Sequence, residues 1–190
     1  KRFSFINSNF KHLKKYLNHY DIFKVNGIIA DFGVSSHQLD VPSRGFSIMK
    51  EGPLDMRMNK ASDLTAESVV NDYGEKKLYK ILKEYGQVSQ ANKIVNKIVS
   101  NRKVKPIKST TDLVKVVENS ISKISKYKIL AKIFQSIRIE VNNELEVIKQ
   151  LLLQASELLK IKGRMVCISY HSLEDRLIKN FIRSGSFDNR

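Results

Sequence analysis

The residues best suited to chemistry in this sequence lie between Gly27 and Met58. The short apolar run Ile28-Ile29-Ala30 ends at Asp31, a pattern typical of a buried strand in a parallel sheet. The crevice beyond the carboxyl ends of such strands is where α/β folds bind ligands. Asp31 and the backbone that follows it are therefore placed to offer hydrogen-bond acceptors to a bound molecule.

The segment after Asp31 is predicted to be a long irregular loop, which is uncommon in a compact domain unless the loop has a function. Glycines and prolines give the loop unusual backbone angles and stiffness, at Gly33, Pro42, Gly45, Gly52 and Pro53. Between them lie polar or charged side chains, at Gln38, Asp40, Arg44, Asp55 and Arg57. We interpret this loop as the floor and lid of a binding site.

Two segments carry mixed strand and helix patterns, which predicts an α/β core interrupted by an insertion. Residues 1–63 form the first part of this core, with an alternating strand-like run at Phe3–Ile6, a short helix at His12–Tyr20 and the strand Gly27–Asp31. Residues 138–190 form the second part, with a helix at Glu144–Lys160, a buried strand at Arg164–Tyr170 and a helix that starts with a capping box from Ser172 to Asp175.

Residues 64–137 are expected to form a helical insertion domain, because four helical patterns follow one another there without a strand between them. The third of these helices has Thr111 as its expected N-cap. Between Lys76 and Arg138 there are 16 Lys or Arg residues but 3 Asp or Glu residues. Most of the formal net charge of +15 therefore belongs to this segment.

A basic segment suits a polyanionic partner, and the insertion offers candidate nucleic-acid-binding residues at Lys97, Arg102, Lys103 and Lys105. The alternative is that these side chains merely cover a solvated face. No apolar run approaches the roughly 20 residues that a membrane span needs, and no signal peptide is visible. The sequence therefore predicts a cytoplasmic protein that does not bind membranes, and nothing in it indicates an oligomer.

Other kinds of site find little support in the sequence. The single cysteine, Cys167, excludes an internal disulfide and lies in an apolar run, as a small core residue would. The four histidines are dispersed without ligand spacing, so no metal site is predicted. The surroundings of Ser35 and Ser36 do not match the G-x-S-x-G turn of serine hydrolases.

Five sequence motifs follow one another between Phe3 and about Arg183: DFGVSSHQLD, RGFS, GPLDMRM, FQSIRIEVNNEL and SYHSLEDR. In these motifs and in their order, the chain resembles the bacterial ribosomal RNA small subunit methyltransferase H family. The resemblance implies a Rossmann-like, class I methyltransferase fold with an inserted helical domain. It also implies S-adenosylmethionine as cofactor, and methylation of a cytosine N4 in the decoding region of small-subunit (16S) ribosomal RNA. The expected partner is that RNA or the assembled small ribosomal subunit.

The resemblance also suggests roles for individual residues. By it, Phe10 contacts the cofactor beside the adenine, Asp31 lies near the cofactor's amino-acid end, and Gln38 also binds the cofactor. Other residues lie in the family's motifs as candidates to contact the substrate or to hold the loop, and the resemblance does not decide between these roles. They are Asp40, Arg44, Asp55, Arg57, His171, Ser172 and Glu174. Asp55 and Arg57 form either a buried ion pair or part of the reaction site. His171 either touches the target base or hydrogen-bonds a loop.

Methyl transfer to an amine needs alignment, and acceptors for the amine N–H groups as the nitrogen pyramidalises. Asp31 is therefore the candidate catalytic residue. The chain departs from the family in matching neither its first strand and glycine-rich turn nor its basic tail, so we expect an incomplete cofactor site with weak binding or none. A noncatalytic RNA-binding remnant is the alternative. A helical protein-interaction module is a third interpretation, but it leaves the long loop unexplained.

Overall fold

The computed structural model describes residues 3–187 and has two compact units. One unit, here the α/β unit, contains the residues up to Gly33 and those from Glu144 onward. The other, here the helical unit, is Val34–Asn143. Among the described residues, no helix is both long enough and apolar enough to cross a membrane.

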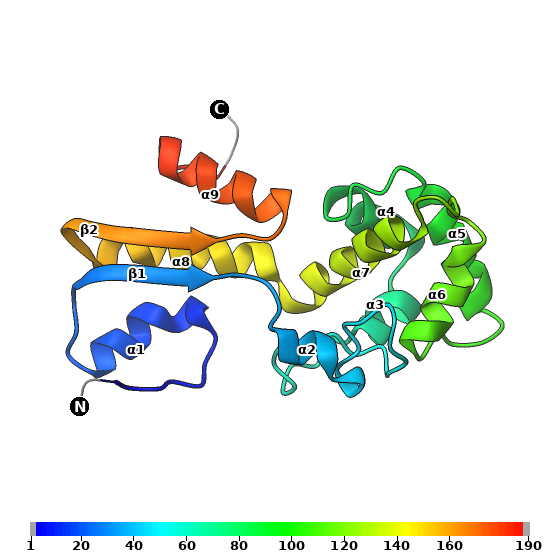
Figure 1. Ribbon diagram of the computed structural model, residues 1–190, viewed down its shortest axis with the longest axis horizontal. Helices are drawn as coiled ribbons and strands as arrows, with labels where there is room; N and C mark the ends of the chain where they lie inside the picture. The colour runs from blue at the N-terminus through cyan, green and yellow to red at the C-terminus, as the bar shows by residue number, and fades with distance from the viewer. Residues whose placement is uncertain (1–2, 188–190) are drawn as a thin grey trace. The chain divides into compact units, whose positions relative to one another are not determined.

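The α/β unit is built on two parallel strands that run side by side, β1 (Val25–Asp31) and β2 (Leu159–Ile168) (Figure 1). Their register pairs Gly27 with Arg164 and continues to Asp31 with Ile168, so both strands end at the same edge. The remaining elements of this unit are a 3₁₀ turn at Phe10–His12, α1 (Leu13–His19), α8 (Glu144–Leu158) and α9 (Ser172–Ser184).

The core of the α/β unit lies on one face of the two strands. Buried leucines and isoleucines of α8 and α9 pack there around Phe32, and the inward strand residues Ala30, Met165 and Cys167 pack against them. Burial raises the pKa of the Cys167 thiol, as expected for a small core residue. The alternate residues Ile29, Val166 and Ile168 are exposed. The predicted burial of the strands therefore holds on one face only.

Residues 3–6, which the sequence analysis predicted as a strand, are irregular, and Phe3 and Phe5 are each 77% exposed. Their apolar and polar alternation is typical of a strand, but a strand also needs a hydrogen-bonding neighbour, and β1 pairs with β2 instead. The prediction of a strand at Phe3–Ile6, and with it a β-α-β arrangement of this run, the helix His12–Tyr20 and the strand Gly27–Asp31, is therefore wrong. The parallel pair forms between two segments that the helical unit and α8 separate in sequence.

The helical unit contains two short helical segments and five longer helices. They are α2 (Ser36–Asp40), a 3₁₀ turn at Pro42–Arg44, α3 (Ala66–Asp72), α4 (Glu75–Glu84), α5 (Ala91–Arg102), α6 (Thr110–Glu118) and α7 (Lys126–Asn142). Ser109, rather than Thr111, caps α6, because its hydroxyl accepts from the Asp112 N–H while the Asp112 carboxylate accepts from the Ser109 N–H.

The long loop belongs to the helical unit in its contacts. Phe46, Leu54 and Met56 are buried in the same cluster as the helix residues. The loop also packs backbone against backbone, since a Cβ on Gly52 would lie 1.8 Å from the Pro42 carbonyl oxygen. The chain consequently passes from one unit to the other at Gly33–Val34 and Asn143–Glu144, whereas the domain boundaries expected from the sequence fall after residues 63 and 137.

Candidate functional site

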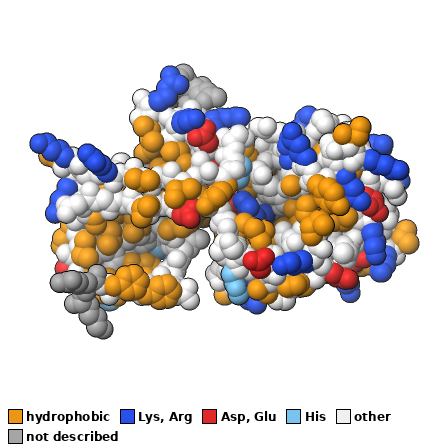
Figure 2. All heavy atoms as spheres, in the orientation of Figure 1, with side chains coloured by type: hydrophobic (Ala, Val, Ile, Leu, Met, Phe, Trp, Pro, Cys, Tyr) orange, Lys and Arg blue, Asp and Glu red, His pale blue; other side chains and the backbone are white. Residues whose placement is uncertain are grey.

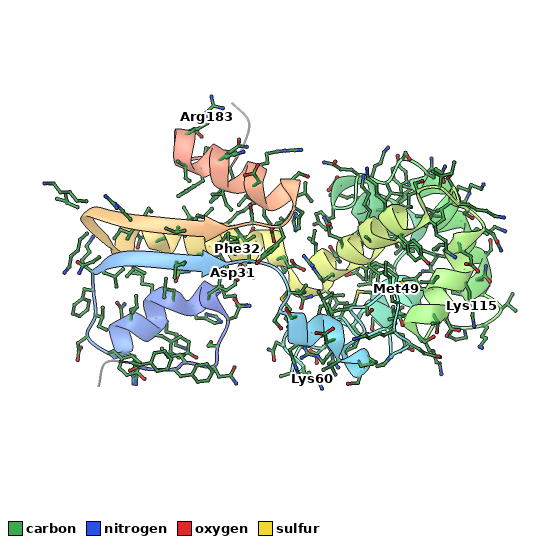
Figure 3. The ribbon with its side chains drawn as sticks, in the orientation of Figure 1. Asp31, Phe32, Met49, Lys60, Lys115 and Arg183 are labelled. Carbon is green, nitrogen blue, oxygen red and sulfur yellow. The ribbon has the colours of Figure 1, made fainter. Side chains whose placement is uncertain are left out.

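Asp31 lies at the carboxyl end of β1 with an exposed carboxylate (Figure 3). Its Oδ1 accepts a hydrogen bond of 3.0 Å from the Tyr170 hydroxyl. That bond raises the pKa of Tyr170, so the hydroxyl keeps its proton and acts as the donor. The next residue, Phe32, donates its N–H to the Ile168 carbonyl over 3.1 Å, which keeps the two strand ends together beyond the last paired residues.

Phe10 lies next to this strand end. Its ring centroid is 5.8 Å from that of Phe32, at an angle of 56°, and 40% of the residue stays exposed. An aromatic ring with a free surface and an exposed carboxylate thus occur at the same end of β1. The structure shows this proximity; the roles of the two residues toward a cofactor stay predictions.

His171 and Glu174 together fix the start of α9. The His171 Nδ1 accepts from the Glu174 N–H at 3.4 Å, and the Glu174 Oε2 accepts from the N–H groups of Tyr170 at 2.8 Å and His171 at 3.4 Å. The capping box therefore begins at His171, one residue before the predicted Ser172, which is the exposed first residue of the helix. The contact of His171 with its loop is thus present, while a contact with a target base stays a prediction.

Within residues 3–187, the side chains of Glu144, His171 and Glu174 form a group whose candidate metal-ligand atoms lie within 4.8 Å of one another. Two carboxylates and an imidazole could hold a divalent cation. The geometry of His171 and Glu174 is that of the α9 cap: His171 Nδ1 accepts from the Glu174 N–H, and His171 Nε2 lies 3.3 Å from Glu174 Oε1. We therefore assign these two side chains to the anchoring of α9.

In the helical unit, Asp55 and Arg57 form the ion pair that the sequence analysis gave as one alternative. The guanidinium donates to both carboxylate oxygens, at 2.7 and 3.0 Å, and also to the carbonyls of Lys60 and Ser62. Burial raises the pKa of Asp55, but the hydrogen bonds and charge of Arg57 outweigh burial, and the net pKa lies below the ordinary value.

The other predicted loop residues also carry structural contacts. The Arg44 guanidinium donates to the Arg57 carbonyl over 2.6 Å, and Asp40 pairs with Lys50 at 3.2 Å. The Gln38 side chain accepts from the Ser35 N–H at 2.9 Å and completes the capping box of α2. These contacts hold the loop, and none of them tests a role toward cofactor or substrate.

We expect Arg57→Ala to destabilise the helical unit by about 2–4 kcal/mol, because the substitution removes both guanidinium bonds and the positive charge from a partly buried carboxylate, which keeps only the backbone N–H of residue 57, and removes the donor of two carbonyls. Urea titration followed by circular dichroism would measure the loss. Arg164→Ala, which removes an exposed arginine, is the control and should change stability by less than about 0.5 kcal/mol.

The same ion pair predicts a pH dependence. Because the pKa of folded Asp55 lies below the ordinary 3.8, its contribution is present above pH 3.8 and is lost as the pH falls through the folded pKa. The unfolding free energy of Asp55→Asn should therefore depend less on pH in the acid range than that of the unsubstituted chain. Parallel curves for the two proteins would contradict a stabilising role for this pair.

Three of the four candidate RNA-binding side chains are exposed, Lys97 in α5 and Lys103 and Lys105 just after it. Arg102 is partly buried, and its guanidinium donates to the Val70 carbonyl over 2.7 Å. Figure 2 shows Lys and Arg side chains scattered over the visible face of the helical unit, among hydrophobic ones, rather than in a single patch. A role in RNA binding therefore stays a prediction for all four.

One residue at the strand end, Tyr170, was missed as a site candidate in the sequence, and the burial of the candidate Glu174 was missed as well. Tyr170 lies in the motif SYHSLEDR but carries no chemistry of its own until its hydroxyl is seen to reach Asp31. The full burial of Glu174 was equally unforeseen, although a glutamate three residues after His171 is the usual third helical residue of a capping box.

The comparison with known proteins agrees with this architecture. The sequence profile of the MraW methylase family matches residues 1–189. The chain belongs to the MraW methylase family. Its parallel strands and helices are part of the Rossmann-like α/β fold of class I methyltransferases, which confirms the predicted fold class and the predicted resemblance.

Curated members of the MraW family resemble the chain along nearly all of its length. The protein named ribosomal RNA small subunit methyltransferase H from Christiangramia forsetii is 49% identical over 98% of this chain. The proteins of the same name from Cytophaga hutchinsonii and Phocaeicola vulgatus are 47% and 44% identical, over 97% and 100% of the chain. In each case the chain spans 62% of the length of the relative.

Proposed function

We propose that the chain is part of an S-adenosylmethionine-dependent methyltransferase that methylates the N4 of a cytosine in the decoding region of small-subunit ribosomal RNA. The observation that carries the proposal is the exposed carboxylate of Asp31 at the carboxyl end of β1, in a chain of the MraW family. The names of the relatives, ribosomal RNA small subunit methyltransferase H, support the class of substrate. Such a substrate, free or in the small ribosomal subunit, places the reaction in the cytoplasm.

The residues at the end of β1 suit this cofactor. S-adenosylmethionine carries an ammonium group, an adenine and a methyl group on a sulfonium, and it supplies that methyl group when bound. The Asp31 carboxylate can accept from the ammonium, and the exposed ring of Phe10, 5.8 Å from Phe32, can lie against the flat adenine. By the family resemblance, Gln38 is a further proposed cofactor-binding residue.

In the reaction, the chain's residues serve mainly to position the amine and accept its N–H groups. A cytosine N4 is a weak nucleophile because its lone pair is delocalised into the ring. Asp31 accepts a hydrogen bond from the amine as the nitrogen pyramidalises, which favours the transition state over the ground state. Bound S-adenosylmethionine would supply the methyl group to the nitrogen, and the Asp31 carboxylate, which accepts from the amine N–H, would take up the proton that the nitrogen loses and pass it to water.

The helical unit would bind the RNA through phosphate contacts, which give affinity without reading sequence. Its exposed Lys97, Lys103 and Lys105 are the proposed contacts. The target base would leave its stack to reach the methyl group. His171 and Ser172 of the α/β unit, and Arg44, Asp55 and Arg57 of the helical unit, are the further residues proposed to act on the substrate.

Calorimetric titration of S-adenosylmethionine into the 190-residue chain and into the full-length gene product tests the cofactor half of the proposal. Methyl transfer from labelled cofactor to small-subunit RNA, followed by nucleoside analysis, tests the product. Cofactor binding by the full-length product and formation of N4-methylcytidine would support the proposal. Binding of RNA without binding of cofactor by either protein would favour the noncatalytic RNA-binding remnant instead.

A further inference from the structure

Tyr170 connects the ends of the two strands through its side chain. It lies two residues after β2, and its hydroxyl donates to Asp31 Oδ1 over 3.0 Å. The strands are in register up to the pair Asp31 and Ile168, so the hydrogen bond extends the strand pairing by a side-chain contact. No other hydrogen bond to the Asp31 side chain occurs among the described residues that the α/β unit contributes.

Tyr170 makes two further contacts, one through its backbone N–H and one through its ring. Its backbone N–H donates to the Oε2 of Glu174 over 2.8 Å, and Glu174 is completely buried. Its ring lies against Gly33, where an added Cβ would be 3.3 Å from the ring carbon Cδ2. Gly33 has a φ of +86°, a conformation that residues with a Cβ rarely adopt. The backbone of Tyr170 is therefore fixed, and its ring, although the residue is 67% exposed, has Gly33 against one side and the bond to Asp31 at its hydroxyl.

An exposed aspartate without a fixed partner is free to rotate about its two side-chain torsions, and that freedom must be lost when a ligand binds. The hydrogen bond from the Tyr170 hydroxyl restricts the rotation of the Asp31 carboxylate before a ligand binds. It occupies Oδ1 and leaves Oδ2 to accept from a ligand N–H. This is the preorganisation that a hydrogen-bond acceptor at a reaction centre requires.

We propose that Tyr170 is a positioning residue, which orients the Asp31 carboxylate toward the N–H groups of the cofactor and of the target amine. The inference rests on the proposed function, because it takes those groups to be the ligands of Asp31. It assigns a role to the Tyr170 hydroxyl that neither strand pairing nor the capping of α9 requires, since those contacts use backbone atoms and the side chains of His171 and Glu174.

Tyr170→Phe tests this role, because it keeps the ring against Gly33 and removes only the hydroxyl. In the full-length gene product, we expect the dissociation constant for S-adenosylmethionine, measured by calorimetry, to rise about 5- to 10-fold. In an Asp31→Ala background, the same substitution should change that constant by less than about twofold. In methyl transfer, kcat should fall while the KM for RNA stays unchanged. Tyr20→Phe removes a hydroxyl from another exposed tyrosine of the same unit and serves as the matched control.

Equal weakening by Tyr170→Phe with and without Asp31 would overturn the proposal, because the hydroxyl would then act independently of the carboxylate. No weakening by Tyr170→Phe, together with a loss in Tyr170→Ala, would overturn it in favour of the ring as a stacking surface. If the unsubstituted full-length protein binds no cofactor, the proposed function itself fails and this inference fails with it. Cofactor binding that Tyr170→Phe leaves unchanged removes the inference alone.

Discussion

Asp31→Ala is expected to lower the rate of methyl transfer at least about 100-fold while leaving RNA binding within twofold of the unsubstituted protein. The substitution removes the exposed acceptor at the end of β1, together with the partner of the Tyr170 hydroxyl. It leaves the helical unit, with its basic surface, untouched. Transfer of a labelled methyl group to small-subunit RNA measures the first effect, and fluorescence anisotropy of a labelled RNA measures the second.

Two further variants separate charge, shape and general disruption. Asp31→Asn keeps one acceptor oxygen and the shape of the side chain, so it should retain more activity than Asp31→Ala if hydrogen bonding contributes beside charge. Asp175→Ala removes another aspartate of the same unit, one that pairs with Lys179, and should leave the rate nearly unchanged. An equal loss of methylation and RNA binding in Asp31→Ala would remove Asp31 from the chemistry.

The sequence indicated the elements of the α/β unit wherever the apolar periodicity was strong. The strand at β1 was predicted within two residues of its observed start, and α8 within two residues of its observed end. The run at Phe3–Ile6 shows the limit of such patterns. Alternation tells which residues could share a face, but only a neighbouring strand decides whether a segment joins a sheet.

The capping boxes show a second limit. A capping box was predicted for α9 and an N-cap alone for α6, and Ser109 and His171 proved to be the N-caps where Thr111 and Ser172 were expected. Several polar residues near a helix start can each serve as a cap, and the choice depends on which carboxylate can reach back to the backbone. For α9, that carboxylate belongs to Glu174, which is buried by the fold as a whole.

The candidate site was partly predictable for a similar reason. The position of Asp31 at a strand end follows from the apolar run before it, and the ion pair of Asp55 with Arg57 was one of the two alternatives given for these residues. The contact between Asp31 and Tyr170 joins residues 139 positions apart, and no local pattern encodes it. The burial of Phe46, Leu54 and Met56 likewise depends on helices that follow much later in the chain.

Charge reversal at Lys97, Lys103 and Lys105 is expected to weaken RNA binding about 100-fold at low salt and to reduce the slope of log K against log salt concentration by about 2 to 3. The three side chains are exposed on and just after α5, where they are free to approach phosphates. Each lysine that neutralises a phosphate releases counterions on binding, so its loss lowers the salt dependence as well as the affinity. Anisotropy titrations over a range of potassium chloride concentrations measure both quantities.

The matched control reverses Lys15, Lys160 and Lys162, three exposed lysines of the α/β unit, and changes the net charge by the same amount. If the helical unit binds the RNA phosphates, this control should lower the affinity for RNA only slightly and leave the slope of log K against log salt concentration unchanged. Equal effects of the two triple variants would mean that the overall charge of +15 attracts RNA without a defined surface. An unchanged slope in the α5 variant would place the RNA-binding surface away from these lysines, and the helical unit would then need another role.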